Sequence, residues 1–343
     1  MIHGGDIYNN KVNMDFSVSV NPMGMPSTVK DALIESVKDC SRYPEIDSKR
    51  LCEKCAEEFR IYPKNVLFGN GSSELFMAIA HAYKPKKVLI PVPSFYGYEH
   101  AFSSSSNEVV YYPMKEQNDF SLDEDFLDHI DSEYDFLILA NPNNPTGHLI
   151  DRLLMEDIMD ECKEKNIRVI LDESFIDFSD AKRSFVTRID EYPNLCIIRS
   201  FTKIFAIPSV RLGYMICSDT GFIENVRKHI PEWNVSGPAQ AVGEKCFDCK
   251  DFISESIAYI DKEKAYLKNE LEKLGIKVYD SDCNYLMIRT DILLYDYLLL
   301  EKILIRNCEN FRGLCKGFYR IAVKKHEENE MLVNTLNKFD VWN

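Results

Sequence analysis

Short apolar runs that end in polar loops alternate along this chain with stretches of helical spacing. Met155, Ile158, Met159 and Cys162 fall on one face of such a helical stretch. This alternation of strand, helix and strand predicts an α/β fold, in which helices cover both faces of a mostly parallel sheet. Ligands of such sheets bind at the carboxyl ends of the strands, where the polar loops follow. The apolar runs lie within residues 86–95, 135–147, 167–175, 195–203 and 211–218.

The pattern changes after residue 235. A long helical stretch over 252–274 ends at Gly275, and strand-like segments and a last helix over 327–339 follow. We therefore expect a large domain over 41–235 and a smaller α+β domain over 236–343. The N-terminal segment, 1–40, is expected to pack with the small domain.

The net charge of −14 argues against a nucleic-acid partner, which needs a basic surface. No signal peptide or membrane span is predicted, and eleven scattered cysteines fit free thiols in a reducing cytoplasm. Two C-x-x-C pairs, Cys52 with Cys55 and Cys246 with Cys249, leave a zinc site as the less favoured alternative to structural cysteines. We expect no metal.

A glycine-containing turn stands where a short apolar run gives way to a helix. Gly69 and Gly71 form a G-x-G pattern without the third glycine that dinucleotide folds carry. A phosphate held by the helix N-terminus and by the hydroxyls of Ser72 or Ser73 is the favoured interpretation. An ordinary helix cap would also account for this turn.

Two charged side chains follow neighbouring predicted strands. Asp172 ends one apolar run, where an acid needs a cation or a metal beside it. Lys203 follows the next run, and a lysine with a lowered ammonium pKa can form a Schiff base with an aldehyde. An aldehyde, a cationic ring nitrogen, a ring hydroxyl and a phosphate occur together in pyridoxal 5′-phosphate, which is the predicted cofactor.

Three motifs in this order resemble the fold-type I pyridoxal-phosphate enzymes, the aspartate aminotransferase superfamily: "NNPTG", "DESF" and "SFTKIFAIPSVRLGY". The resemblance implies that Lys203 carries the cofactor and moves protons at the substrate α-carbon. It also implies that Asp172 pairs with the ring nitrogen, that Asn144 donates to the ring hydroxyl and that Phe95 stacks on the ring. The residues that it assigns to the cofactor phosphate are Gly71, Ser72, Ser73, Ser200, Thr202 and Arg211.

The same resemblance implies roles at the substrate end of the site. Arg320 would grip the substrate α-carboxylate, and Tyr43 would reach the cofactor phosphate of a neighbouring subunit, which implies a homodimer. Arg306, His3 and Asn21 are the further candidates for binding a small phosphorylated substrate. A surface salt bridge is the alternative for Arg306, and a mobile terminus is the alternative for His3.

Within the superfamily the chain resembles two groups of enzymes, the L-threonine-O-3-phosphate decarboxylases and the histidinol-phosphate aminotransferases. Its "HGGDIY" start and Phe175, where the aminotransferases usually have tyrosine, favour the decarboxylases, whereas Asp6 and Ser19 depart from them. The favoured prediction is decarboxylation of a phosphorylated hydroxy-amino acid, as in cobalamin side-chain synthesis. The alternative is amino transfer with 2-oxoglutarate and glutamate in histidine biosynthesis. A non-catalytic binding module is less favoured, because such regulators carry an additional basic domain.

Overall fold

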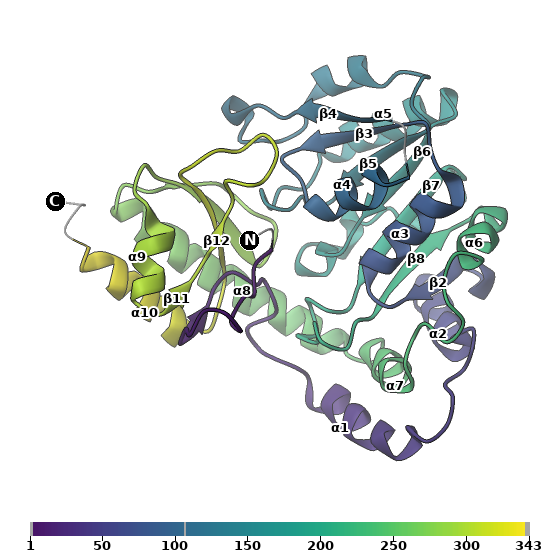
Figure 1. Ribbon diagram of the computed structural model, residues 1–343, viewed down its shortest axis with the longest axis horizontal. Coiled ribbons are helices and arrows are strands. Elements are labelled where there is room, and N and C mark those ends of the chain that lie inside the picture. The colour runs from purple at the N-terminus through teal and green to yellow at the C-terminus, as the bar shows by residue number, and fades with distance from the viewer. Residues whose placement is uncertain (1–2, 106–107, 340–343) are drawn as a thin grey trace.

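A computed structural model of the protein describes residues 3–105 and 108–339. Its larger sheet has the strand order β2-β8-β7-β6-β5-β3-β4 (Figure 1). The strands from β7 through β6, β5 and β3 to β4 run parallel, and β8 is antiparallel to both β7 and β2. The α/β prediction with a mostly parallel sheet is therefore confirmed. The bounds are β2 Val66–Gly69, β3 Lys87–Val92, β4 Glu108–Pro113, β5 Phe136–Ala140, β6 Arg168–Asp172, β7 Leu195–Ser200 and β8 Gly213–Cys217.

Helices cover both faces of this sheet because successive side chains of each strand point to opposite sides. Ile138 in β5 belongs to a core with α3 and α4, whereas Leu137 and Leu139 belong to the other core, with α5. Three helices, α2, α6 and α7, complete the covering. The bounds are α2 Lys49–Phe59, α3 Ser72–Tyr83, α4 Tyr96–Ser103, α5 Arg152–Glu164, α6 Thr220–Arg227 and α7 Gly237–Cys246.

A second sheet of four antiparallel strands, in the order β12-β13-β10-β9, lies beside the larger one (Figure 1). The 24-residue helix α8 reaches from the larger part to this sheet, and α9 and α10 complete it. The bounds are α8 Lys250–Lys273, β9 Lys277–Val278, β10 Tyr285–Arg289, α9 Leu294–Leu300, β11 Ile303–Leu304, β12 Arg306–Asn307, β13 Phe318–Ala322 and α10 His326–Asn337.

The N-terminal segment divides between the two parts. Strand β1 (Met14–Asp15) pairs with β11 in parallel, and Phe16 accepts a backbone hydrogen bond from Ala322 of β13. Farther along, α1 (Ser27–Ser36) packs against α7. The domain boundaries at residues 40 and 235 stay predictions. Short 3₁₀ helices connect the elements: Val37–Asp39, Pro63–Asn65, Glu116–Asn118, Glu124–His129, Ile176–Phe178, Ala181–Arg183 and Val186–Arg188.

In the larger sheet the structure adds two strands, β2 and β4, that the sequence pattern did not assign. Strand β2 has only four residues, and β4 lies at the sheet edge, where most of its side chains are not buried. Both C-x-x-C pairs are buried thiols: Cys52 and Cys55 lie in α2, Cys246 is the last residue of α7, and Cys249 is the N-cap residue of α8. Among residues 3–105 and 108–339 no cluster of His, Cys, Asp or Glu could hold a metal ion. None of the described helices is long and apolar enough to cross a membrane.

Candidate active site

The carboxyl ends of three parallel strands bring the main candidate residues into one cavity. Asp172 is the last residue of β6, Lys203 lies three residues beyond β7, and Asn144 lies four residues beyond β5. They line a cavity of about 340 Å³, which we call the reaction pocket. Other predicted residues that line it are His3, Ser72, Ser73, Phe95, Ser200, Thr202, Arg211 and Arg320.

Lys203 lies in an environment that favours its neutral amine. Burial lowers the pKa of Lys203 to about 8, and the guanidinium groups of Arg320 and Arg211 act in the same direction, whereas Asp172 opposes them. A lysine with this pKa has an appreciable fraction of free amine near neutral pH. This side chain can therefore act as a nucleophile toward an aldehyde and as a proton carrier.

Asp172 is held from two sides. Tyr98 in α4 donates to its Oδ2 at 2.6 Å, and the backbone N–H of Ser174 donates to its Oδ1 at 2.8 Å. Burial raises the pKa of the Asp172 carboxyl, and the hydrogen bonds from Ser174 and Tyr98 oppose that rise. A cation bound in the pocket would further favour the ionised carboxylate.

Tyr98 was missed by the sequence reasoning. Its ring also meets the ring of Phe95 edge-on, at a centroid distance of 5.6 Å. The available signal was its position three residues after Phe95, at the start of a helix, where the two side chains share one face. One helix thus supports both the predicted stacking ring and the predicted partner of the ring nitrogen.

The first turn of α3 forms an anion-binding cradle. Its N-cap residue, Gly71, makes no side-chain cap and has a φ of 80°, in the region that favours glycine. A Cβ atom at Gly71 would lie 2.5 Å from Nη2 of Arg211, so the glycine allows the guanidinium to approach the turn. The hydroxyls of Ser200 and Thr202 lie 2.8 Å apart in the same pocket. Backbone N–H groups, hydroxyls and a guanidinium are the groups that bind phosphate.

Arg320 in β13 enters the pocket from the smaller sheet. Its Nη1 donates to Oδ1 of Asn144 and its Nη2 donates to the backbone oxygen of Ser17 at 3.0 Å. Its Nε is buried and has no hydrogen-bond partner among the described residues. Phe175 lines the same pocket and packs edge-on against Tyr285, at a centroid distance of 5.2 Å.

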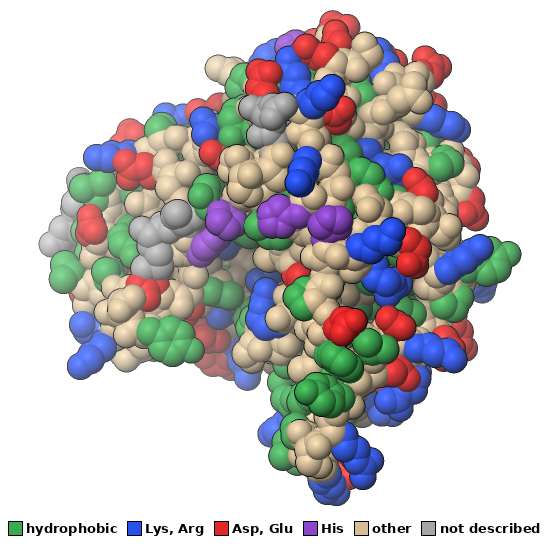
Figure 2. All heavy atoms as spheres, turned by 45° about the vertical axis from the view of Figure 1, so that its right-hand side comes forward, with side chains coloured by type: hydrophobic (Ala, Val, Ile, Leu, Met, Phe, Trp, Pro, Cys, Tyr) green, Lys and Arg blue, Asp and Glu red, His purple; other side chains and the backbone are tan. Residues whose placement is uncertain are grey.

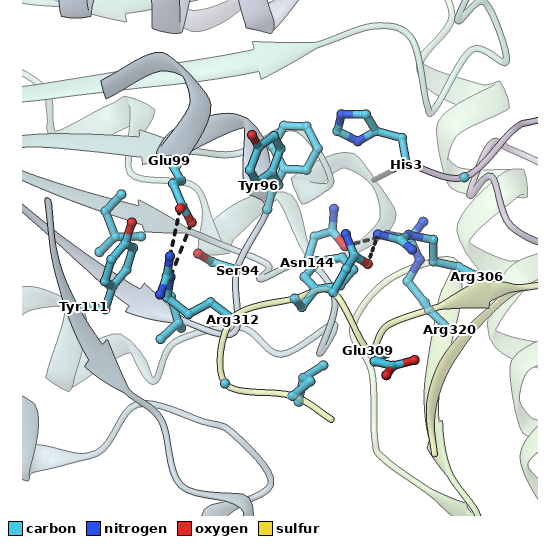
Figure 3. A pocket seen from close by; sticks show the side chains of 18 residues that line it. His3, Ser94, Tyr96, Glu99, Tyr111, Asn144, Arg306, Glu309, Arg312 and Arg320 are labelled. Carbon is cyan, nitrogen blue, oxygen red and sulfur yellow. Dashed lines mark hydrogen bonds and ion pairs between the residues drawn. The ribbon is translucent and has the colours of Figure 1, made fainter. Parts of the chain in front are cut away.

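A second cavity of about 400 Å³ adjoins the reaction pocket and shares its His3, Phe95, Asn144 and Arg320 walls; we call it the outer cavity (Figure 3). Arg306 lines the outer cavity and is buried. Burial lowers the pKa of the Arg306 guanidinium to about 10, and Arg320 acts in the same direction, so Arg306 is charged at neutral pH. Figure 2 shows histidine side chains gathered at the middle of one face, between the two parts of the molecule.

The far wall of the outer cavity carries an ion pair. Arg312 Nη2 lies 2.8 Å from Oε1 of Glu99, and the guanidinium lies 4.0 Å from the centroid of the Tyr111 ring (Figure 3). His3 lies at the other side, with its ring 5.8 Å from that of Phe95. Burial, Arg306 and His100 lower the pKa of His3, so this imidazole is mainly neutral at pH 7.

Apart from Gly71 at the cradle and Arg306 in the outer cavity, two predicted residues, Asn21 and Tyr43, do not line the reaction pocket. Asn21 is buried, and its Nδ2 donates to the backbone oxygen of Ile204 and to Ser256 Oγ at 2.8 and 2.7 Å. Its backbone N–H also bonds to the oxygen of Lys203, so Asn21 holds the lysine segment and does not line the pocket. The Asn21 amide turns toward the backbone oxygen of Ile204 and the hydroxyl of Ser256, both far from Asn21 in the chain. Tyr43 is 82% exposed, and its ring lies 4.9 Å from that of Trp233.

The groups that line the reaction pocket fit pyridoxal phosphate. The cradle at α3 suits its phosphate, the buried carboxylate of Asp172 suits its ring nitrogen, and the Lys203 amine suits its aldehyde. Three buried polar atoms of the lining, Ser19 Oγ, Ser174 Oγ and Arg320 Nε, have no hydrogen-bond partner among the described residues and are available to a ligand.

Comparisons with known proteins agree with this arrangement. A family model described as "Aminotransferase class I and II" matches residues 11–336. Threonine-phosphate decarboxylase from Salmonella typhimurium is 35% identical over 94% of this chain and 90% of its own length. Histidinol-phosphate aminotransferase from Pyrococcus furiosus is 30% identical over 93% and 90%. The crystal structure of the histidinol-phosphate aminotransferase from Clostridium acetobutylicum is 31% identical, covers 96% of this chain and 99% of its own, and superposes with a TM-score of 0.89.

Proposed function

Because the chain belongs to the aminotransferase class I and II family, we propose that it is a pyridoxal-phosphate enzyme that decarboxylates a phosphorylated amino acid, O-phospho-L-threonine being the favoured substrate. The observation that carries the substrate class is the pair of buried arginines, Arg320 and Arg306, in adjoining cavities beside Lys203. A substrate with a carboxylate at one end and a phosphate at the other needs two such cations.

The chain's own residues account for binding of the cofactor. Lys203 is the attachment point, Asp172 holds the ring nitrogen, and the α3 cradle holds the phosphate. Asn144 accepts from Arg320 through Oδ1, which directs its Nδ2 as the donor to the ring hydroxyl. Phe95 covers one face of the ring, and Tyr98 supports Phe95 from the side. When bound, pyridoxal phosphate takes up the substrate amine at its aldehyde carbon and withdraws electrons from the bond that breaks.

The arginines orient the substrate. The guanidinium of Arg320 is held by its hydrogen bonds to Ser17 and Asn144. Its Nε–H can therefore donate to the substrate α-carboxylate without movement of the guanidinium. Arg306 binds the phosphate from the outer cavity. The apolar ring of Phe175 excludes water from its part of the reaction pocket. After the bond between Cα and the carboxylate carbon breaks and CO₂ leaves, Lys203 Nζ delivers the proton that the α-carbon needs. The product is a phosphorylated amino alcohol.

Amino transfer from histidinol phosphate to 2-oxoglutarate is the second candidate. The 31% identity and the TM-score of 0.89 to an aminotransferase structure support it, whereas the 35% identity to a decarboxylase, against 30% to an aminotransferase, favours decarboxylation. The two reactions share every binding group named above. They differ in which bond of the α-carbon is held in the reactive orientation, and residue types do not specify that orientation.

A paired assay of the purified, cofactor-loaded protein tests the proposal. One arm measures CO₂ release from O-phospho-L-threonine, and the other measures glutamate made from histidinol phosphate and 2-oxoglutarate. We expect CO₂ release without glutamate. Glutamate without CO₂ would assign the protein to the aminotransferases. If neither CO₂ nor glutamate is formed, both candidate functions are contradicted.

We also propose that the active form is a homodimer in which Tyr43 reaches the cofactor phosphate of the partner subunit. Support comes from large hydrophobic side chains that are exposed in the single chain: Ile34, Val37, Tyr43, Ile46 and Trp233. The α1 region that carries some of them projects from the body (Figure 1). Mixing the inactive variants Lys203→Ala and Tyr43→Ala should restore activity, since the mixed dimer contains one site with both residues. No recovery in mixed dimers would contradict the shared site.

A further inference from the structure

Glu74 lies in the first turn of α3, next to the phosphate cradle, but belongs to a different hydrogen-bond network. Its Oε2 accepts from the backbone N–H of Asn70 at 2.7 Å and from Nδ2 of Asn234 at 2.7 Å. Asn234 also donates to the backbone oxygen of Phe68, at the end of β2, at 3.2 Å. Glu74 and Asn234 thus connect the strand before the cradle, the turn itself and the segment between α6 and α7.

This network holds the turn that precedes the helix. The N–H of Asn70 is taken by Glu74, and the N–H of Gly71 is taken by the oxygen of Gly69 at 2.8 Å. The next N–H groups, those of Ser72 and Ser73, start the helix, and Gly71 provides no side chain to cap them. The N–H groups that remain belong to Ser72 and Ser73, two residues that line the reaction pocket.

A carboxylate in the first turn would by itself compete with a phosphate for the positive end of the helix. Here two donors on the side of the turn away from the pocket engage the Glu74 oxygen, and within the described residues Glu74 is not part of the pocket wall. Its charge therefore stabilises the turn, and its hydrogen bonds set the direction of the free N–H groups. The opposite side of the cradle is equally constrained, since a Cβ at Gly213 would lie 2.7 Å from the backbone nitrogen of Ser72.

From these contacts we propose that Glu74 and Asn234 are positioning residues for the cofactor phosphate. They hold the Asn70–Gly71 turn in the conformation in which the first N–H groups of α3 converge on a phosphate. Neither side chain touches the cofactor. The inference rests on the proposed function, because it requires that the α3 cradle receives the phosphate of pyridoxal phosphate.

The test compares two probes on the apoenzyme, pyridoxal phosphate and pyridoxal, which lacks the phosphate. Dissociation constants come from the absorbance of the bound cofactor. We expect Glu74→Ala and Asn234→Ala to weaken binding of pyridoxal phosphate about tenfold, the scale of one lost hydrogen bond to a charged group. The same variants should leave pyridoxal binding within about twofold of the wild type. Glu74→Gln, which keeps an acceptor oxygen, should lose less than Glu74→Ala.

Two controls make the outcome decisive. Asp251 is an exposed acid in the first turn of α8, and Asp251→Ala should change neither dissociation constant. Competition by inorganic phosphate against pyridoxal phosphate gives a second readout, and its inhibition constant should rise in the Glu74 and Asn234 variants.

Equal weakening of both probes, or an unchanged preference for pyridoxal phosphate in the variants, would overturn the positioning role. A wild-type protein that binds both probes equally, or neither, would instead refute the proposed function, because its cradle would then not bind the cofactor phosphate. If the wild type prefers pyridoxal phosphate to pyridoxal and the variants do not, the result supports both the positioning role and the proposed function.

Discussion

The lowered pKa of Lys203 predicts an unusual pH dependence for the reaction of the apoenzyme with an aldehyde. A change from 10.5 to about 8 corresponds to about 3 kcal/mol in favour of the neutral amine. At pH 7, one unit below the lowered value, about one tenth of the Lys203 side chains are neutral, whereas an ordinary lysine has only about three neutral amines in ten thousand. The rate of attachment should therefore rise with pH and level off above pH 8 to 9.

Pyridoxal followed by borohydride trapping measures this rate, and mass spectrometry of the Lys203 peptide identifies the site. Because Arg320 contributes to the low pKa, Arg320→Met should move the midpoint to higher pH. Arg312→Met is the matched control, since Arg312 pairs with Glu99 in the outer cavity. A rate that keeps rising through pH 10, as for a lysine in a short peptide, would refute the reasoning. An equal shift in both variants would also refute it.

Three further substitutions test the site. Lys203→Ala should abolish turnover and borohydride-trapped cofactor, and turnover that survives would contradict the assignment of this lysine. Arg306→Gln should lower kcat/KM for O-phospho-L-threonine about 30-fold or more, mostly through KM, because a buried cation that binds the phosphate is lost; an equal loss with unphosphorylated threonine would contradict that contact. Tyr98→Phe removes a hydrogen bond that lowers the pKa of Asp172, so the pKa of Asp172 should rise further. As the pH is lowered, the variant should therefore lose activity at a higher pH than the wild type does. A pH–rate profile measures the pH at which activity falls on the acid side. An unchanged value would show that Tyr98 does not affect the pKa of the Asp172 carboxyl.

The sheet and the residues at its edge could be predicted because their causes are local or general. The apolar runs of β5, β6 and β7 alternate with helical stretches, and parallel strands place their carboxyl ends at one edge. Asn144, Asp172 and Lys203 therefore share one pocket, whatever the details of packing. The strands β2 and β4 were not predicted; β2 has only four residues, and β4 pairs on one side only, at the edge of the sheet.

Other features depend on contacts between segments far apart in the chain. Asn21 and Ser256 are 235 residues apart, and no spacing rule indicates that the Asn21 amide turns toward Ser256 instead of the pocket. Burial is the main cause of the lowered pKa of Lys203, and Arg320 adds to it; only the packing of β13 against the larger part places Arg320 nearby. The same holds for the bond between Glu74 and Asn234, 160 residues apart.

The sequence by itself determined which chemical groups stand at the strand ends, because strand periodicity and motif order are encoded within short windows. Only the tertiary structure decided how those groups are held. The hydrogen bond from Tyr98 to Asp172, the bond from Asn234 to Glu74, the orientation of Asn21 and the burial that lowers the pKa of Lys203 all arise where distant segments meet. Burial and long-range hydrogen bonds depend on the whole packed chain, so no single stretch of sequence specifies them.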